Sequence, residues 1–354
     1  MRILVIDPGA TSTKVGIYED GNPVFSGRID HDRRSLNRFS GAVDQEEMRF
    51  RAIESLLTRE GHLPGEFAAV AGRGGLIKPV KGGTYEVNGV MLEDLRKGVG
   101  GEHASNLGGI LAERFASLLG SRAFIVDPVV VDELEPLARL SGLKGIERQS
   151  IFHALNQKAV ARRIASDLKK RYQEINLIVA HIGSGISVGA HRKGRVIDVN
   201  NALDGDGPYS QERTGGLPLR GVLELIGRRN TSVEELSLTV RKSGGLYSYL
   251  GEADLRKIEK CISRGDREAR RVFEGMAYQV SKEIGALAAV LMGRVDATVL
   301  TGGGAYSRRL VGLIRERVDF IAPVFVIPGE LELEALAEGV KRVLDGEESV
   351  QIYG

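Results

Sequence analysis

The chain has 354 residues, of which 42% are hydrophobic and 27% charged, with a formal net charge of +2. This length is typical of two domains. A near-neutral charge does not favour a nucleic-acid or membrane partner, and we expect neither. The single cysteine, Cys261, cannot form an internal disulfide, so we expect a cytoplasmic protein. No apolar run approaches the length of a membrane span, and the opening MRILVIDPG is interpreted as a strand rather than a signal peptide.

The N-terminal segment predicts three strands joined by two turns. The stretch ILVIDPGATSTKVGIY, residues 3–18, has an apolar strand that ends at Asp7, a small-residue turn and a second strand that alternates with a period of two around Lys14. Dinucleotide-binding loops and P-loops have other glycine spacings and lead into a helix, not a strand. A phosphate-facing element here would therefore be a hairpin turn. The alternative is a plain hairpin with a polar tip.

The rest of the first half alternates between strands and helices. We predict a strand at 67–71, a helix at 106–119 and a strand at 123–127, followed by a turn-rich boundary at 141–150. An amphipathic helix at 152–172 then opens the second half.

A second stretch repeats the pattern of the first hairpin. LIVAHIGSGISVGAHRKG, residues 177–194, again has an apolar strand, one polar residue, a glycine-containing turn and a second strand, with His181 in the place of Asp7. Two copies of an unusual unit indicate a duplicated domain, and a ligand could be held between the two turns.

The last third contains a run of three glycines between a strand and a helix. In ATVLTGGGAYSRRLVGLIRERV, residues 297–318, the strand runs into Gly302, Gly303 and Gly304. Backbone N–H groups at such a helix start suit a phosphate or a nucleoside; the alternative is a tight strand-to-helix connection. We also expect a helical set over 219–293 and a final helix over 331–345.

Two hairpin loops and a late Gly-Gly-Gly resemble the sugar kinase, heat-shock ATPase and actin superfamily. Within it, seven motifs in chain order are similar to those of the acetate and butyrate kinases: VIDPGATSTK, AVAGRGG, IVDP, IFHALNQKAVA, AHIGSGIS, SQERTGGLP and VIPGELELEALAEG. The length, Asp7 and the GGLP segment resemble the butyrate kinase branch.

The resemblance implies an α/β fold of the two-lobed, duplicated ribonuclease H-like (actin-like ATPase) kind, with an interlobe nucleotide cleft. The first lobe would span 1–150 with 331–354 returning to it, and the nucleotide-binding second lobe would span 151–330. The implied activity is reversible, ATP-dependent phosphorylation of a short-chain carboxylate to an acyl phosphate. The expected partners are this small carboxylate and a nucleotide, and we expect a homo-oligomer of at least two copies.

The expected chemistry needs cations rather than a base, because a carboxylate has no proton to lose and the γ-phosphate of ATP is anionic. Planar guanidinium groups suit both anions, so we expect catalytic roles for Arg73 and Arg213. By resemblance, His153 would hydrogen-bond the transferred phosphoryl group, and Asp127 would complete the catalytic set.

The remaining candidates bind the nucleotide and Mg²⁺. For ATP or ADP they are Thr11, Ser12, Lys14, His181, Gly183, Ser184, Gly185, Gly302, Gly303 and Gly304. For Mg²⁺ they are Asp7, Asp127 and Glu332, with some contacts through water. Glu332 has a simpler alternative, because an acidic residue at a helix start complements the helix dipole.

Two other functions fit the same superfamily. A sugar or polyol kinase would need a general-base aspartate aimed at a hydroxyl, for which Asp127 is the candidate. A chaperone-like or filament ATPase would need a client domain or a polymer interface. Among acids, butyrate, isobutyrate, valerate or a branched acid fit equally well, and an acetate- or propionate-preferring kinase is the further alternative.

Overall fold

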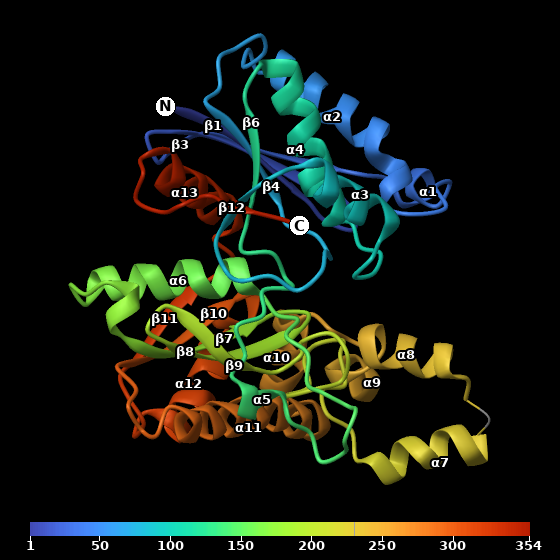
Figure 1. Ribbon diagram of the computed structural model, residues 1–354. Helices are drawn as coiled ribbons and strands as arrows, with labels where there is room; N and C mark the ends of the chain where they lie inside the picture. The colour runs from blue at the N-terminus through green and yellow to red at the C-terminus, as the bar shows by residue number, and fades with distance from the viewer. Residues whose placement is uncertain (230) are drawn as a thin grey trace. The chain divides into compact units, whose positions relative to one another are not determined.

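The computed structural model describes residues 1–229 and 231–354, and these divide into two compact units (Figure 1). The first unit contains Met1–Val131 and Leu331–Gly354, and the second contains Asp132–Glu330. Each unit is built on one β-sheet with helices on both faces, which confirms the expected α/β fold.

The sheet of the first unit has seven strands in the order β12-β5-β6-β4-β1-β2-β3. β1, β4 and β6 run parallel, while β2 and β3 continue the sheet as antiparallel strands. The three strands predicted for the opening stretch are therefore confirmed. Their bounds are β1 (Arg2–Pro8), β2 (Ser12–Glu19), β3 (Asn22–Asp30), β4 (Ala69–Arg73), β5 (Thr84–Glu86), β6 (Arg122–Val126) and β12 (Gln351–Ile352).

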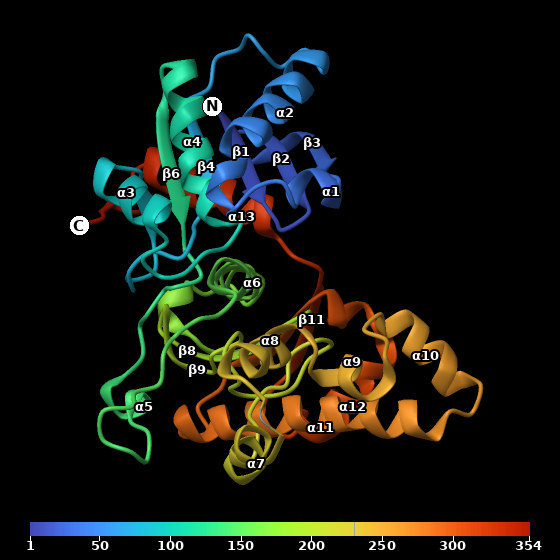
Figure 2. The same ribbon diagram turned by 90° about the vertical axis from the view of Figure 1, so that its right-hand side faces the viewer.

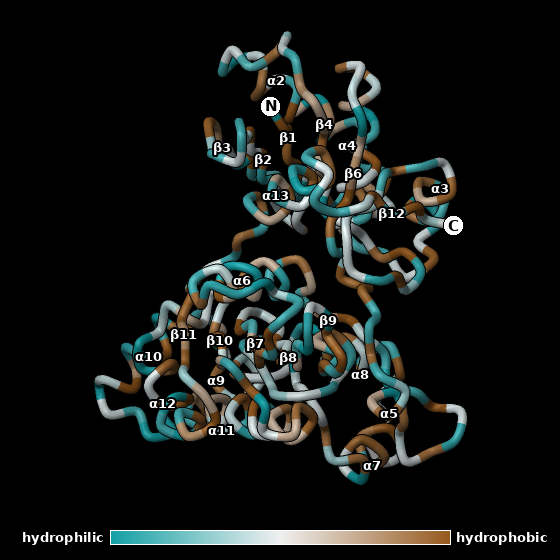
Figure 3. The backbone as a smooth tube through the Cα atoms, turned by 60° about the vertical axis from the view of Figure 1, so that its left-hand side comes forward, coloured by the Kyte–Doolittle hydropathy of each residue, from teal (hydrophilic) through white to brown (hydrophobic). Residues whose placement is uncertain are grey.

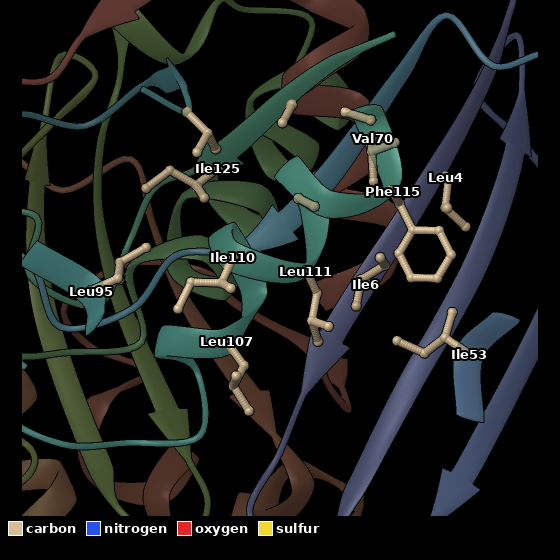
Figure 4. Close-up of a cluster of buried hydrophobic side chains, with 14 of the residues drawn as sticks. Leu4, Ile6, Ile53, Val70, Leu95, Leu107, Ile110, Leu111, Phe115 and Ile125 are labelled. Atoms are coloured by element: carbon tan, nitrogen blue, oxygen red, sulfur yellow. The ribbon is translucent and has the colours of Figure 1, made fainter. Parts of the chain in front are cut away.

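Helices cover both faces of this sheet. α2 and α4 lie on one face and α13 on the other, as Figures 1 and 2 show. Successive side chains of β1 point to opposite faces of the sheet, so the strand packs against helices on both sides. Leu4 and Ile6 point into the core under α4, where Leu111 and Phe115 lie close to them (Figure 4). The helices of the unit are α1 (Arg33–Leu36), α2 (Glu46–Arg59), α3 (Gly89–Lys97), α4 (Asn106–Leu119) and α13 (Glu332–Leu344).

The sheet of the second unit has five strands in the order β11-β10-β7-β8-β9. Its core lies between the sheet and α10, α11 and α12, with α6 on the opposite face (Figure 2). The strands are β7 (Asn176–Ile182), β8 (Ile186–Arg192), β9 (Arg195–Val199), β10 (Ala297–Gly302) and β11 (Val324–Pro328). The helices are α5 (Pro136–Arg139), α6 (Ala154–Asp167), α7 (Leu219–Arg229), α8 (Val233–Lys242), α9 (Gly245–Leu250), α10 (Leu255–Ser263), α11 (Arg267–Val290) and α12 (Arg308–Val318).

The two sheets share one strand order, which confirms the duplication. β6-β4-β1-β2-β3 in the first unit corresponds to β11-β10-β7-β8-β9 in the second, with the same parallel and antiparallel pairs. Asp7 is the next-to-last residue of β1 and lies opposite Lys14, whereas His181 is the next-to-last residue of β7 and lies opposite Ser187. The second hairpin turn is thus shorter than the first.

The boundary between the units falls at Val131, whereas the sequence places it at 150. Residues 132–150 pack with the second unit through charged pairs. Glu133 binds Lys158 at 2.9 Å and accepts a hydrogen bond from the Val196 amide, and the side chains of Glu133 and Lys158 are buried. Arg148 binds Asp198 at 2.8 Å. These pairs join residues distant in sequence, which the local composition at 141–150 does not indicate.

Within the ranges 1–229 and 231–354, no helix combines the length and the hydropathy needed to cross a membrane. Hydrophobic residues are instead concentrated along central strands such as β1 and β10 (Figure 3).

Candidate active site

Three of the expected site residues lie at one edge of the first sheet. Asp7 lies near the end of β1, Arg73 is the last residue of β4, and Asp127 directly follows β6. Because these strands are adjacent and parallel, their carboxyl ends meet at the same edge. Such an edge is the usual position for ligand sites in α/β proteins.

Asp7, Arg73, Lys14 and Glu332 form one network of charges. Arg73 Nη1 lies 3.1 Å from Asp7 Oδ1 and 2.7 Å from Glu332 Oε1. Lys14 Nζ lies 2.8 Å from Glu332 Oε2 and 3.7 Å from Asp7 Oδ2. Both carboxylates are buried, whereas the side chains of Lys14 and Arg73 are 36% and 23% exposed. The cations therefore provide the part of the network that solvent reaches.

The two carboxylates of this network have different proton affinities. Burial raises the pKa of Asp7 to about 7, opposed by Arg73 and reinforced by the Glu332 carboxylate. Burial would also raise the pKa of Glu332. This pKa is nevertheless held below its usual range by the positive charge of Arg73, by a hydrogen bond with Asp7 and by Lys14. Asp7 is therefore mostly protonated below neutral pH, where it donates a hydrogen bond to the ionised Glu332, and it loses this proton as the pH rises through 7.

Glycines allow the backbone around Arg73 to lie close to α4. A Cβ on Gly72 would come within 2.0 Å of the Gly108 carbonyl oxygen, and one on Gly108 within 2.1 Å of the Arg73 carbonyl oxygen. Any larger residue at either position would push the helix off the strand. The glycines of AVAGRGG thus fix the position of Arg73.

Asp127 has a structural partner within its own unit. Its Oδ1 accepts a hydrogen bond from the Gly83 amide at 2.8 Å, and its own amide donates to the Gly83 carbonyl at 2.9 Å. Its φ is +38°, an unusual value for a residue other than glycine and one that often marks a functional position.

The three expected metal ligands do not form a single cluster. Among residues 1–229 and 231–354, no group of three or more His, Cys, Asp or Glu is placed to hold a metal ion. Asp7 and Glu332 do lie together, and their oxygens are of the hard type that Mg²⁺ prefers. With one oxygen from each carboxylate, the pair would supply two ligands, which suits an ion that keeps waters and phosphate oxygens as its other ligands.

Arg49 holds the first hairpin turn, although we did not predict a role for it. This fully buried side chain donates to the carbonyls of Ser12 and Ala10 and to Thr13 Oγ1, at 3.2, 3.4 and 2.9 Å. Burial lowers the pKa of Arg49 to about 10, so it stays charged. Of the expected nucleotide ligands, Thr11 lies in this turn and is exposed, and Ser12 is the first residue of β2.

The sequence contains a signal for Arg49. In EEMRFRAIESLLTR it lies in phase with the apolar face of α2, one helical turn before Ile53 and two before Leu57. A charged residue on a buried helix face must find partners, and here the partners are carbonyls of a loop distant in the sequence.

In the second unit, His153 and His181 are stacked. Their ring centroids are 3.7 Å apart and their planes differ by 8°. His181 Nδ1 lies 2.8 Å from Asn156 Oδ1, and His153 Nδ1 lies 2.8 Å from Ser187 Oγ. The structure thus brings together two histidines that lie in different segments of the chain and that the sequence singles out separately.

Arg213 lies against the second hairpin turn. A Cβ on Gly185 would come within 2.0 Å of Arg213 Nη1, so only glycine leaves room for the guanidinium. Arg213 Nη1 donates to the Ala202 carbonyl at 2.5 Å, and the Ser210 hydroxyl donates to the carbonyl of Ser184, the exposed residue at the turn tip. Burial lowers the pKa of Arg213 below its usual value.

The three-glycine run has two different parts. A Cβ on Gly302 or on Gly304 would come within 2.5 Å of Ile182, at the end of β7, and Gly302 has a φ of +84°. A Cβ on Gly303 would meet nothing within 4 Å. Gly302 and Gly304 thus hold this loop against the second hairpin, whereas Gly303 faces open space beside it.

Comparisons with solved structures agree with this fold. The structure is similar to Porphyromonas gingivalis acetate kinase, with a TM-score of 0.78, 20% identity, and 97% of this chain and 99% of that chain covered. It is similar to a propionate kinase from Francisella tularensis, with a TM-score of 0.75, 18% identity, and 96% and 98% covered. For the ROK hexokinase from Thermus thermophilus the TM-score is 0.51 at 16% identity, with 98% and 100% covered. At these identities the likeness establishes the fold alone.

The sequence itself matches a family model. The description of that family is the acetokinase family, and the match runs over residues 139–322, more than half of the chain. It includes His153, His181, Arg213 and the three glycines, which the structure places in the second unit. The chain belongs to the acetokinase family.

Proposed function

We propose that the protein is a carboxylate kinase that transfers the γ-phosphoryl group of ATP to a short-chain acid and can run in either direction. The observation that carries the proposal is the network at the edge of the first sheet, where the partly exposed cations Arg73 and Lys14 lie over two buried carboxylates. The acetokinase family membership supports the same reaction class.

In the proposed reaction a carboxylate oxygen of the acid attacks the γ-phosphorus in line with the leaving ADP. One P–O bond forms, the bond to the β,γ-bridging oxygen breaks, and no proton is transferred. The protein therefore has to position two anions and offset their repulsion. We assign the acid carboxylate to the Arg73 guanidinium, because Arg73 binds carboxylate oxygens in the free protein.

The second unit supplies the groups for the phosphoryl oxygens. Arg213 is a partly buried, charged guanidinium beside the second hairpin turn, and His153 is a ring fixed by stacking and by Ser187. Donors fixed in this way favour the charge that develops on the trigonal phosphoryl group. Within this unit, we assign the nucleotide phosphates to the second hairpin turn and to Gly303.

Mg²⁺, when bound with the nucleotide, would neutralise phosphate charge. Asp7 and Glu332 are the residues that would hold it, through their own oxygens or through water. Loss of the proton on Asp7 would accompany binding, since a cation favours the ionised carboxylate. We propose butyrate or a branched analogue as the acid, based on Asp7 and the GGLP segment; acetate and propionate are the alternatives.

The reverse reaction tests the proposal. Purified protein should form ATP from ADP, Mg²⁺ and butyryl phosphate, as measured by a luciferase assay, and the same preparation with buffer in place of ADP is the control. If none of butyryl, isobutyryl, acetyl and propionyl phosphate yields ATP, the proposed carboxylate kinase function is wrong. ADP release from ATP with a sugar or polyol in that case would favour the sugar kinase alternative.

A further inference from the structure

A chain of buried side chains leads from Tyr172 to His153 in the second unit. Tyr172 Oη lies 2.6 Å from His191 Nδ1, and His191 Nε2 lies 3.0 Å from Gln157 Oε1. Gln157 Nε2 lies 2.8 Å from Ser187 Oγ, which lies 2.8 Å from His153 Nδ1. Of these residues, His191, Gln157 and Ser187 are fully buried, so water cannot substitute for a missing partner.

The orientation of Gln157 is set by a backbone group. Gln157 Nε2 lies 3.0 Å from the Ser187 carbonyl oxygen, which can only accept a hydrogen bond. The nitrogen of the amide must therefore face Ser187, and the oxygen must face His191. It follows that His191 carries its proton on Nε2 and accepts from Tyr172 through Nδ1. Burial lowers the pKa of His191 to about 3, so the ring is neutral and has only this one proton.

The direction of the hydrogen bond between Ser187 Oγ and His153 Nδ1 follows from counting the donors and acceptors around the hydroxyl. Its hydroxyl oxygen accepts from Gln157 Nε2 and from the His153 backbone amide, the latter at 3.4 Å. A hydroxyl has two acceptor sites and one proton, so both acceptor sites are occupied. The proton is left for the remaining neighbour, His153 Nδ1.

We infer that Ser187 and Gln157 are positioning residues that hold His153 as the neutral tautomer with its proton on Nε2. In this form His153 Nδ1 is an acceptor and Nε2 is a donor. A donor at Nε2 can hydrogen-bond a phosphoryl oxygen without transferring its proton. The assignment of the tautomer depends on the hydrogen bonds alone, whereas its role in the reaction depends on the proposed kinase function.

NMR of the parent protein tests the tautomer directly. In ¹⁵N-histidine-labelled protein at neutral pH, His153 should show a pyrrole-type nitrogen at Nε2 and a pyridine-type nitrogen at Nδ1. The opposite pattern, or a doubly protonated ring, would overturn the inference. This measurement needs no variant and no activity, so it is separate from the test of the proposed function.

Two variants test the roles of the positioning residues. Ser187→Ala should give a mixture of His153 tautomers and lower kcat by about tenfold, the effect of one net hydrogen bond, with KM for ATP nearly unchanged. Gln157→Leu should also give a mixture, because one acceptor site of the Ser187 hydroxyl is then empty and its proton is no longer confined to His153 Nδ1. Ser281→Ala is the matched control, since this buried hydroxyl donates only within α11. Retention of the parent tautomer in both variants would rule out the positioning roles.

Discussion

At the scale of single residues, the central feature of the site is the Arg73 guanidinium, which contacts two buried carboxylates. Its Nη1 contacts two carboxylates, that of Asp7 on β1 and that of Glu332 on α13. Lys14 joins the same pair from β2. Asp7, Lys14 and Arg73 meet because β1, β2 and β4 are neighbours in the sheet. The helix α13 adds Glu332 from the last part of the chain.

Replacing Arg73 with lysine should separate the effect of charge from that of geometry. Lysine keeps the positive charge but loses the planar pair of N–H donors, so we expect kcat/KM to fall by about 10- to 100-fold. Arg73→Ala should cost a further factor of about 10 or more. Thermal denaturation of each variant gives the control for folding. An Arg73→Lys enzyme with the parent kcat/KM would show that the acid is not bound by the guanidinium.

Asp7 should make the stability of the protein depend on pH. Its folded pKa of about 7 lies above its ordinary value of 3.8, so its protonation stabilises the folded state fully below about pH 4 and this contribution is lost as pH rises through 7. Asp7→Asn mimics the protonated form. We expect the free energy of unfolding of this variant, relative to the parent, to improve by about 2–4 kcal/mol between pH 5 and pH 8.

Urea denaturation of both proteins at pH 5 and pH 8, without nucleotide or Mg²⁺, measures this change. Asp20→Asn is a suitable control, because Asp20 is exposed and lies outside the network. If the difference in free energy of unfolding between Asp7→Asn and the parent is the same at both pH values, Asp7 is ionised throughout this range.

At the scale of elements, the three-glycine segment has positions that leave no room for a side chain and one position that does. Gly304→Ala would place a Cβ within 2.5 Å of the Ile182 side chain, so we expect a loss of about 1–3 kcal/mol in stability. Gly303→Ala meets no neighbour and should leave the melting temperature almost unchanged. If Gly303 faces the nucleotide, its alanine variant should raise KM for ATP. Equal melting temperatures for the two variants would contradict the packing described for Gly304.

Elements with strong local patterns could be predicted from the sequence. The opening hairpins and the helix at 106–119 match β1, β2, β3 and α4, because apolar periodicity and turn residues are local. α2 was not predicted, and with it the role of Arg49 was missed. The short strands β5 and β12 pair although most of the chain separates them, and strands as short as these carry no periodic signal.

The site could be predicted only as residue types. Polar residues at strand ends indicated Asp7, Asp127 and His181 as candidates, and the structure places each at such an end. The resemblance grouped Asp7 and Glu332 as ligands of one ion. The contacts that Arg73 and Lys14 make with this pair were not indicated, because they depend on tertiary packing. The same holds for the stacking of His153 on His181 and for the chain through Ser187. The boundary between units was placed late for the same reason, since the Glu133–Lys158 pair is not visible in local composition.

At the scale of the whole molecule, the duplicated sheet explains why the site residues come in two sets. The same strand position carries Asp7 in one copy and His181 in the other, and the opposite residue is Lys14 in one and Ser187 in the other. At these two positions the first copy thus carries a carboxylate and a cation, and the second carries an imidazole and a hydroxyl. This difference fits the proposed division between binding the acid and holding the phosphoryl group.

The most direct test of the proposed reaction is the trapping of acyl phosphate by hydroxylamine. The enzyme, with ATP and Mg²⁺, is given acetate, propionate, butyrate, isobutyrate or valerate, and hydroxamate is measured for each, with glucose and glycerol assayed for ADP release. We predict hydroxamate from at least one acid, with the highest kcat/KM for butyrate or isobutyrate, and no release of ADP above background with the sugar or polyol. ADP release with glucose or glycerol and no hydroxamate from any acid would contradict the account.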